Sequence, residues 1–228
     1  MKQIIIKRHI GRNNSIMNVI EKYISIEGEG LFQGYPTVFI RFAGCNLKCS
    51  YCDSLYSHNI KNSKNINIAD ILIYILKSKV KRVTLTGGEP LYQDNIYKLI
   101  NILVYNKINV NIETNGSITI NNVNEKAIIT MDYKLPSSNM ESFMNLNNLK
   151  LLKQNDVLKF VCKDENDLNT ALNIINKYNL QCNIFFSPVF NCIQPKRIVE
   201  FILDNKLFNC RVQLQIHKYI WNPEMRGV

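Results

Sequence analysis

The stretch "TVFIRFAGCNLKCSYC", residues 37–52, joins an apolar run to three closely spaced cysteines. Its first six residues are mainly β-branched or aromatic, a composition typical of a buried strand. Cys45, Cys49 and Cys52 then follow within eight residues, one cysteine short of the usual closed metal site. The stretch therefore predicts a strand that delivers three soft ligands and leaves one ligand position open.

Outward from this stretch, apolar runs alternate with helical patterns along most of the chain. The expected strands are 37–42, 82–86, 109–114, 127–131, 157–161, 182–186 and 211–216. The expected helices are about 68–79, 93–106, 165–178 and 195–205. Such alternation predicts right-handed βαβ units around a parallel sheet. About six units are too few for a closed eight-fold barrel, so we expect an open, partial parallel β/α barrel of the α/β class.

Composition narrows the class of protein. The chain has 228 residues, 46% of them apolar and 20% charged, which suits one domain with a full core. No apolar run is long enough to span a membrane, and the first residues lack the pattern of a signal peptide, so we expect a cytoplasmic protein. The net charge of +10 raises the possibility of nucleic-acid binding. Because the lysines are spread out and form no block, we expect neither a nucleic-acid nor a membrane partner.

Polar or glycine-containing segments follow five of the expected strands. They are "CNLKCSYC" (45–52), "TGGEP" (86–90), "ETNG" (113–116), "MDYK" (131–134) and "SP" (187–188). The carboxyl ends of parallel strands meet at one rim, where α/β proteins place their sites. We therefore expect these segments to converge on one face.

The open ligand position has more than one explanation. Thiolates bind zinc and iron–sulfur clusters, and a zinc site would recruit His58, six residues after Cys52. We favour a solvent-exposed loop position for His58, because the surrounding sequence is polar and rich in turn formers. A cubane cluster held by three cysteines leaves one iron open to a small molecule, as in a catalytic site. The scattered cysteines are expected to be buried thiols: Cys162, Cys182, Cys192 and Cys210.

At these residues the sequence resembles a known family. The C-x3-C-x2-C spacing with Tyr51 before the last cysteine, and the "TGGEP" segment, are similar to the signatures of radical S-adenosylmethionine enzymes. "SIEGEGLFQGYPTVFIRFAGCNLKCSYCDS" (25–54), "DYKLPSS" (132–138) and "QIHKYIWNPEMRGV" (215–228) resemble the 7-carboxy-7-deazaguanine synthase family. The resemblance begins near Asn18. It implies one radical S-adenosylmethionine domain at 17–228, and we expect residues 1–16 to be a dispensable N-terminal extension.

The resemblance implies a reaction, cofactors and partners. The reaction is conversion of 6-carboxy-5,6,7,8-tetrahydropterin to 7-carboxy-7-deazaguanine with loss of ammonia, a lyase step towards queuosine and related deazapurines. The cofactors are a [4Fe–4S] cluster, S-adenosylmethionine bound to its open iron, and Mg2+. The implied partners are a second copy of the chain in a homodimer and an electron donor such as flavodoxin or ferredoxin.

The resemblance also implies residue roles. Cys45, Cys49 and Cys52 match the cluster ligands, and Ser54 matches the hydroxyl ligand of Mg2+. The positions that contact S-adenosylmethionine are Tyr51, Asp53, Gly88, Asp132, Tyr133 and Lys134. The substrate positions are Glu27, Gly28, Glu29, Arg41, Thr86 and the carboxylate of Val228, whose segment is expected to close over the substrate. Two places depart from the family pattern, because Glu27 stands where Gln is common and "MDYK" stands for a more familiar "SPK".

Physical chemistry supports some of these roles and leaves alternatives open. A guanidinium such as that of Arg41 can bind a carboxylate with two hydrogen bonds, yet within an apolar strand it could equally be a structural ion-pair partner. The glycines of "TGGEP" permit close approach, and their amides could bind the cosubstrate. Another radical S-adenosylmethionine enzyme, such as a glycyl-radical-enzyme activase, shares the cysteine spacing. A non-enzymatic zinc or iron–sulfur module is the alternative from a different class.

Overall fold

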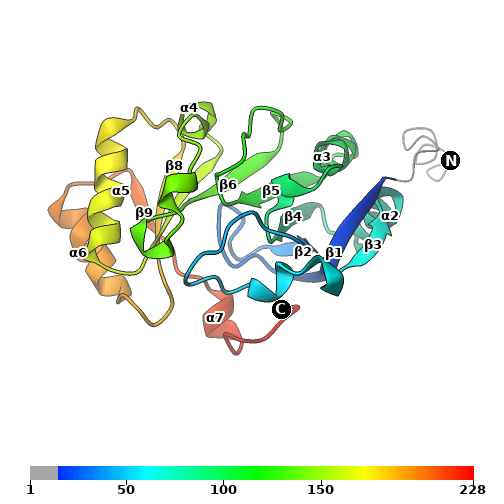
Figure 1. Ribbon diagram of the computed structural model, residues 1–228, viewed down its shortest axis with the longest axis horizontal. Helices are drawn as coiled ribbons and strands as arrows, with labels where there is room; N and C mark the ends of the chain where they lie inside the picture. Colours follow the sequence, from blue (N-terminus) through cyan, green and yellow to red (C-terminus); the bar gives the residue numbers. More distant parts are fainter. Residues whose placement is uncertain (1–14) are drawn as a thin grey trace.

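The computed structural model describes residues 15–228, and its centre is a nine-stranded sheet (Figure 1). The strand order is β3-β1-β2-β4-β5-β6-β7-β8-β9. The strands are β1 (Ile16–Ile26), β2 (Pro36–Phe42), β3 (Lys64–Asn67), β4 (Arg82–Gly87), β5 (Asn109–Thr114), β6 (Ile128–Tyr133), β7 (Val157–Cys162), β8 (Asn183–Pro188) and β9 (Cys210–Val212). Strands β2 and β4 to β9 are parallel. The sheet ends at β3 and β9 without closing, which confirms the expected open, partial barrel.

Two strands at one edge were not predicted. β1 pairs antiparallel with both β2 and β3, and a register shift lies between Val19 and Glu21. Ile16, which begins β1, pairs with Asn67, and the buried Ser15 accepts a hydrogen bond of 2.8 Å from Lys98. Of the predicted extension 1–16, residues 1–14 lie outside the described part of the chain.

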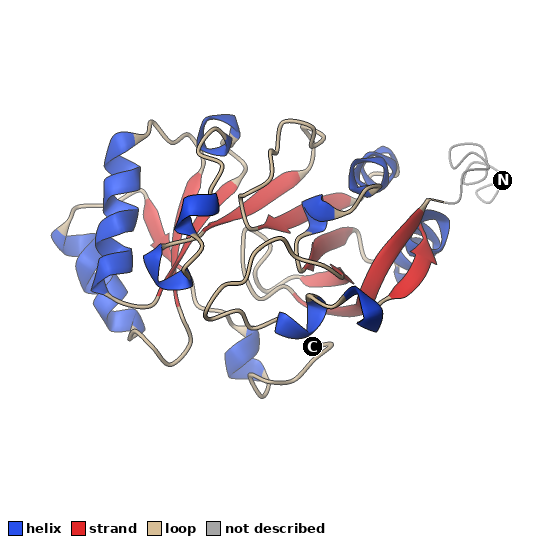
Figure 2. Ribbon diagram, in the orientation of Figure 1, coloured by secondary structure: helices blue, strands red, loops and turns tan. Residues whose placement is uncertain are grey.

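The longer helices follow the strands and pack on the outer side of the curved sheet (Figure 2). They are α2 (Ile68–Ser78), α3 (Ile96–Tyr105), α5 (Glu165–Lys177) and α6 (Pro195–Asp204), and α4 (Asn148–Leu151) and α7 (His217–Ile220) are single turns. The side chains of Asn67 and Asp164 cap α2 and α5 by accepting backbone N–H bonds. Pro195 begins α6, where its fixed φ is favourable.

Alternation along the strands gives the sheet two different faces. Val83 and Leu85 of β4 are fully buried in the apolar core beneath the helices. Thr84 and Thr86, their neighbours in sequence, face the concave side, because successive side chains of a strand point in opposite directions. The same alternation on β5, β6 and β7 gives the concave side Asn111, Glu113, Thr130, Asp132 and Lys159. The fold therefore reserves one side of the sheet for polar chemistry.

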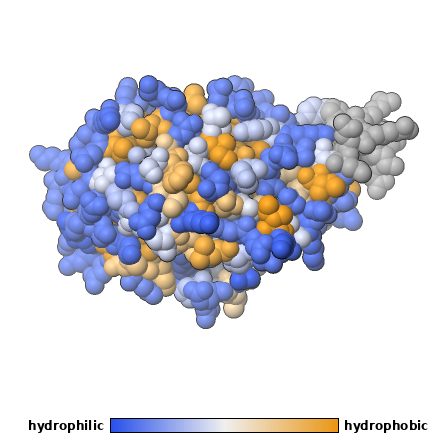
Figure 3. Space-filling model, in the orientation of Figure 1, coloured by the Kyte–Doolittle hydropathy of each residue, from blue (hydrophilic) through white to orange (hydrophobic). Residues whose placement is uncertain are grey.

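The described part of the chain can be compared with the requirements for a membrane-spanning helix. No helix within residues 15–228 has the length and apolar character needed to cross a bilayer. In the view of Figure 3, hydrophilic residues dominate the outline, and hydrophobic residues gather towards the middle of the face.

Candidate active site

Two adjoining cavities open on the concave side of the sheet. The thiol cavity, about 210 Å³, is lined by the loop after β2 and by the ends of β4 to β7. The tail cavity, about 740 Å³, is lined by β1, by residues 26–29 and by the C-terminal residues 222–228. Both cavities are lined by Glu29, Arg41, Tyr51, Cys52, Asp53, Ser54, Val189, Phe190 and Lys218. Because the cavities share this wall, two ligands bound in them would lie against each other.

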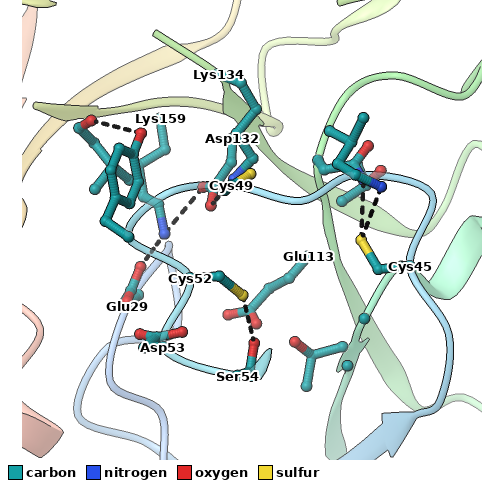
Figure 4. Close-up of a pocket in the computed structure, with 18 of the residues that line it drawn as sticks. Glu29, Cys45, Cys49, Cys52, Asp53, Ser54, Glu113, Asp132, Lys134 and Lys159 are labelled. Atoms are coloured by element: carbon teal, nitrogen blue, oxygen red, sulfur yellow. Dashed lines mark hydrogen bonds and ion pairs between the residues drawn. The ribbon is translucent and has the colours of Figure 1, made fainter. Parts of the chain in front are cut away.

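Three thiols face the thiol cavity from different sides (Figure 4). The Sγ atom of Cys45 lies 3.8 Å from Nδ2 of Asn115 at the end of β5. Burial raises the pKa of the Cys49 thiol, and the nearby ammonium of Lys134 opposes that rise. The cavity is lined by no cysteine besides Cys45, Cys49 and Cys52. These residues thus supply three thiolate donors, and no fourth, to one shared space.

The donor set fits a polynuclear group. All seven cysteines are free thiols. Within residues 15–228, no three His, Cys, Asp or Glu side chains are grouped so as to hold a single metal ion. In a [4Fe–4S] cluster each thiolate binds a different iron, so the thiolates stand around the cluster instead of meeting at one point. Cys45, Cys49 and Cys52 have that arrangement around the thiol cavity.

His58 is not the exposed loop residue that the sequence suggested. Its side chain lines the thiol cavity, and Nε2 lies 3.5 Å from Sγ of Cys52. Cys192 also departs from expectation, because it is exposed and lines the tail cavity. It lies in the loop between β8 and α6 and not on the strand itself, which explains why its apolar neighbours in sequence do not cover it. Cys162, on β7, is buried as expected, whereas Cys182 and Cys210 are only half-buried.

The "TGGEP" segment fastens the cysteine loop to β4. Gly87 has φ of +136°, and a Cβ atom on Gly88 would lie 2.1 Å from the carbonyl oxygen of Gly44. The Gly88 N–H donates to Phe42 at 3.0 Å, and the Glu89 N–H donates to Gly44 at 2.8 Å. These two amides are therefore bonded within the chain and do not bind a ligand as expected, although Gly87 and Gly88 still line the thiol cavity. The glycines are needed for close backbone approach.

The end of β6 carries two of the three predicted cosubstrate residues. Asp132 and Lys134 line the thiol cavity and form an ion pair of 3.2 Å. Tyr133 lies between them on the opposite face, where it is 3% exposed and packs on Phe160 with ring centroids 5.8 Å apart. Alternation along the strand therefore places Tyr133 in the apolar core and not at the predicted contact.

Lys159 of β7 was missed from the sequence and is central to the site. Its ammonium binds the carboxylate of Glu29 and lies 3.0 Å from Asp132. Burial alone would lower the pKa of Lys159, but the charges of Asp132, Glu29 and Glu113 outweigh burial and raise it. A lone lysine in the apolar run "VLKFV" was the available signal, because lysine is rarely buried without a partner. Lys159 joins the Glu29 loop to the end of β6.

Glu113 and Thr86 also reach the thiol cavity. In the view of Figure 4 the carboxylate of Glu113 points towards Cys52 and Ser54, and all three residues line the thiol cavity. Burial raises the pKa of Glu113, the neighbouring charge of Glu29 adds to the rise, and Lys159 opposes it. Thr86, near the end of β4, lines the thiol cavity and not the tail cavity.

The loop between β1 and β2 crosses to the far end of the sheet. Gln213 accepts a hydrogen bond from the Gly30 N–H at 2.8 Å and donates to the Gly30 carbonyl at 3.0 Å. Gln33 donates to the carbonyl of Leu214 at 2.6 Å, and Gln215 donates to Glu29. We call these contacts the seam, because they connect the two sides of the open sheet without a strand ladder.

The predicted substrate residues 27–29 lie along this loop. Gly28 leaves no room for a side chain, because a Cβ atom there would lie 2.1 Å from Nδ1 of His217. Glu27 lines the tail cavity, is 1% exposed and accepts a hydrogen bond from the hydroxyl of Thr84. Burial, with the charge of Glu113 next in size, raises the pKa of Glu27 to about 8. No cation of the described chain lies within ion-pair distance of Glu27.

Arg41 combines the two interpretations that the sequence left open. Its Nε donates to Glu21 at 2.8 Å, and its Nη2 donates to the hydroxyl of Tyr23 at 3.4 Å. Glu21 also accepts a hydrogen bond of 2.8 Å from Tyr56. Arg41 lines both cavities as well. It is therefore an ion-pair partner that also forms part of the wall of both cavities.

The C-terminal segment folds back over the tail cavity. Val228 lines this cavity, and the guanidinium of Arg226 lies 3.7 Å from the centre of the Tyr56 ring. Lys218, just after the start of α7, forms an ion pair of 3.1 Å with Asp53. These contacts place Val228 in the wall of the tail cavity, and its contact with the substrate stays a prediction.

Comparison with known proteins agrees with this geometry. Residues 39–134 match the family model described as the radical SAM superfamily. The chain is 50% identical over 221 residues to 7-carboxy-7-deazaguanine synthase of Clostridium acetobutylicum, covering 92% of this chain and 98% of the relative. It is 40% identical to the enzyme of that name from Methanospirillum hungatei, with coverages of 92% and 88%. Among solved structures, QueE from Escherichia coli shares the fold, with a TM-score of 0.74 at 20% identity over 87% of this chain and 93% of that one.

Proposed function

The chain belongs to the 7-carboxy-7-deazaguanine synthase family of radical S-adenosylmethionine enzymes, and from this premise we propose that it converts 6-carboxy-5,6,7,8-tetrahydropterin to 7-carboxy-7-deazaguanine with loss of ammonia. The observation that carries the proposal is the pair of joined cavities. One offers three thiols without a fourth, and the other is lined by acidic residues, Arg41 and the chain end. The reaction is a step in queuosine and deazapurine biosynthesis.

The thiol cavity suits the cluster and its cosubstrate. Cys45, Cys49 and Cys52 would hold the cluster, which together with S-adenosylmethionine supplies the one-electron chemistry that removes a hydrogen atom from a substrate. The Asp132–Lys134 pair offers one charge of each sign, as the ammonium and carboxylate of an amino acid require. Tyr51, Asp53 and Gly88 complete the proposed cosubstrate wall.

The tail cavity suits a carboxylated pterin. The guanidinium N–H groups of Arg41 that are not bound to Glu21 can donate to the substrate carboxylate. Glu29 can accept hydrogen bonds from the amino and ring N–H groups of the pyrimidinone edge. Glu27 and Gly28 of the tail cavity are proposed as further contacts, with the carboxylate of Val228 as an additional acceptor. Thr86 is proposed to contact the substrate from the adjoining thiol cavity.

Ser54 is the proposed protein ligand of Mg2+. Its hydroxyl lies on the wall shared by the two cavities, 3.7 Å from Sγ of Cys52. Mg2+ keeps several waters and accepts few protein ligands beside substrate oxygens, so one hydroxyl at the substrate boundary suits it. A homodimer, and a small reducing protein such as flavodoxin or ferredoxin as electron donor, complete the proposal for the cytoplasmic enzyme.

An anaerobic assay tests the proposal directly. Protein with a reconstituted cluster is incubated with S-adenosylmethionine, a chemical reductant, Mg2+ and 6-carboxytetrahydropterin. We expect ammonia and 7-carboxy-7-deazaguanine in equal amounts, and a fall in rate when Mg2+ is chelated. Formation of 5′-deoxyadenosine without either product would reject the substrate while leaving the radical chemistry intact. A chain that binds zinc and no iron would reject both.

A further inference from the structure

His58 lies close to a thiol that the proposed cluster needs. Its Nε2 atom is 3.5 Å from Sγ of Cys52, a separation that suits an N–H···S hydrogen bond. The only other polar side chain bonded to this sulfur within the described residues is that of Ser54, at 3.7 Å. Of the three cluster thiols, His58 therefore contacts that of Cys52.

A short turn holds the ring in this place. Residues Leu55–Ser57 form a 3-10 turn, and the backbone N–H of His58 donates to Leu55 at 3.1 Å. The hydroxyl of Ser57 donates to Ser54 at 2.7 Å, and the carbonyl of Ser57 accepts the Gly44 N–H at 2.8 Å. The turn is thus tied to both ends of the cysteine loop. The position of His58 relative to Cys52 is therefore built by the backbone and does not depend on a free loop.

We propose that His58 donates a hydrogen bond from Nε2 to the thiolate of Cys52 and so makes the bound cluster easier to reduce. A thiolate offers only lone pairs, so the contact selects the ring form that carries a proton on Nε2. The amide of Asn115, 3.8 Å from Cys45, is a second donor aimed at the same group of ligands. The inference rests on the cluster of the proposed function and is independent of the substrate.

The effect on reduction follows from charge. An electron added to the cluster increases the negative charge on its sulfur ligands, and a donor hydrogen bond becomes stronger as that charge grows. The donor therefore stabilises the reduced form more than the oxidised form and raises the reduction potential. His58 is in this sense a positioning residue, since it acts on the cluster through Cys52.

Two substitutions separate donation from packing. His58→Leu removes the donor and puts an apolar side chain of comparable size in its place. His58→Gln keeps an amide N–H at about the reach of Nε2. Both variants and the wild type are reconstituted anaerobically, their iron and sulfide are measured, and the midpoint potential is determined by a redox titration followed by electron paramagnetic resonance. We expect a more negative potential for His58→Leu and a potential near the wild type for His58→Gln, with equal iron content.

A second measurement detects the hydrogen bond to the sulfur directly. Fe–S(Cys) stretching bands in the wild type should shift on transfer to D2O, because an exchangeable proton bonds to the sulfur, and His58→Leu should lose part of that shift. A wild-type potential in an iron-replete His58→Leu protein would overturn the proposal, as would equal losses in the Leu and Gln variants. Absence of any cluster in the wild type would instead reject the iron–sulfur part of the proposed function.

Discussion

The thiol cavity and the tail cavity share a wall but come from different kinds of structure. Strand ends and the fastened loop after β2 build the thiol cavity, so its residues are fixed by the sheet. The tail cavity depends on the β1–β2 loop and on a C-terminal segment held by side-chain contacts such as Arg226 on Tyr56. Changes in the first should therefore abolish radical chemistry, whereas changes in the second should alter substrate affinity and coupling.

The largest effect is expected at the cysteines. Cys45→Ala, Cys49→Ala or Cys52→Ala should each abolish formation of 5′-deoxyadenosine, because the cluster loses one of its three protein ligands. Cys162→Ala, on the buried side of β7, is the matched control and should leave product formation largely intact. Chromatography of 5′-deoxyadenosine measures the outcome. Full activity in any of the three variants would contradict the assignment of the radical chemistry to the thiol cavity.

The next effect concerns the residue that joins the two cavities. Lys159→Met leaves Glu29 and Asp132 without their shared cation, which should cost about 3–5 kcal/mol of unfolding free energy and most of the activity. Urea unfolding measures the loss. The double variant Lys159→Met/Glu29→Gln should recover part of the stability without recovering activity, since it removes one of the stranded charges. Unchanged stability in the single variant would contradict the bridging role.

Glu27 makes the free energy of unfolding depend on pH. Its pKa is about 8 in the folded protein against 4.5 for the free side chain, so the folded state holds its proton more tightly. Between about pH 5 and pH 8 the unfolded chain loses this proton first, and the fold is progressively destabilised. Glu27→Gln should therefore stabilise the protein by an amount that grows across this window to roughly 2–4 kcal/mol at pH 8.

The pH dependence is tested against a control variant, and one outcome would contradict it. Unfolding free energies of Glu27→Gln and wild type are compared from pH 5 to pH 9. Glu125→Gln, at an exposed position, removes the same charge away from both cavities. A constant difference between Glu27→Gln and wild type across the series would show that Glu27 is ionised in the folded protein.

A smaller effect is expected at the chain end. Deleting Arg226–Val228 removes the Tyr56 contact and the terminal carboxylate from the tail cavity. We expect about a tenfold higher KM for the pterin, or about 1.4 kcal/mol, and more 5′-deoxyadenosine per product, with unchanged iron. Arg226→Gln alone should show part of the effect, because it keeps the carboxylate. Native KM and coupling in the deletion would mean that the segment does not contribute to the site.

The smallest effect is expected at the other terminus. A chain that starts at Met17 loses the hydrogen bond between Ser15 and Lys98 and the pairing of Ile16 with Asn67. Product formation should stay native, with a loss of about 1 kcal/mol or less in unfolding free energy. A chain that starts at Ser15 is the control and should not lose stability. A clear loss of activity in the Met17 chain would show that the predicted extension is needed.

Sequence patterns located the thiol cavity better than the tail cavity, for physical reasons. Parallel strands end at one rim, so "CNLKCSYC", Thr86 and the end of β6 could be placed together from periodicity alone. The same periodicity should have excluded Tyr133, because consecutive strand residues face opposite sides. β1 was missed because Glu21, Lys22 and a register shift interrupt its apolar alternation. The charge of Glu21 has a role in the site, because Glu21 lines the tail cavity and accepts a hydrogen bond from Arg41.

Contacts between distant segments were beyond what local patterns can show. Nothing near Arg226 in the sequence points to Tyr56, and nothing near Lys159 points to Glu29, since these pairs form only when the tail and the loop are folded back. His58 shows the opposite error. Its polar neighbours correctly indicated a turn, but the turn aims the ring at Cys52 instead of at solvent.

The seam has a consequence for how this fold can change over generations. Hydrogen bonds in a strand ladder belong to the backbone, so most substitutions leave them in place. Here the two sides of the sheet are joined mainly through the side-chain amides of Gln33, Gln213 and Gln215, beside one backbone hydrogen bond of 3.3 Å from Ile216 to Gly28. Each of these glutamines can be replaced by a single substitution, which removes its own hydrogen bonds and leaves those of the other two in place. Selection can therefore adjust how firmly the two sides of this open sheet are held together without redesigning any strand.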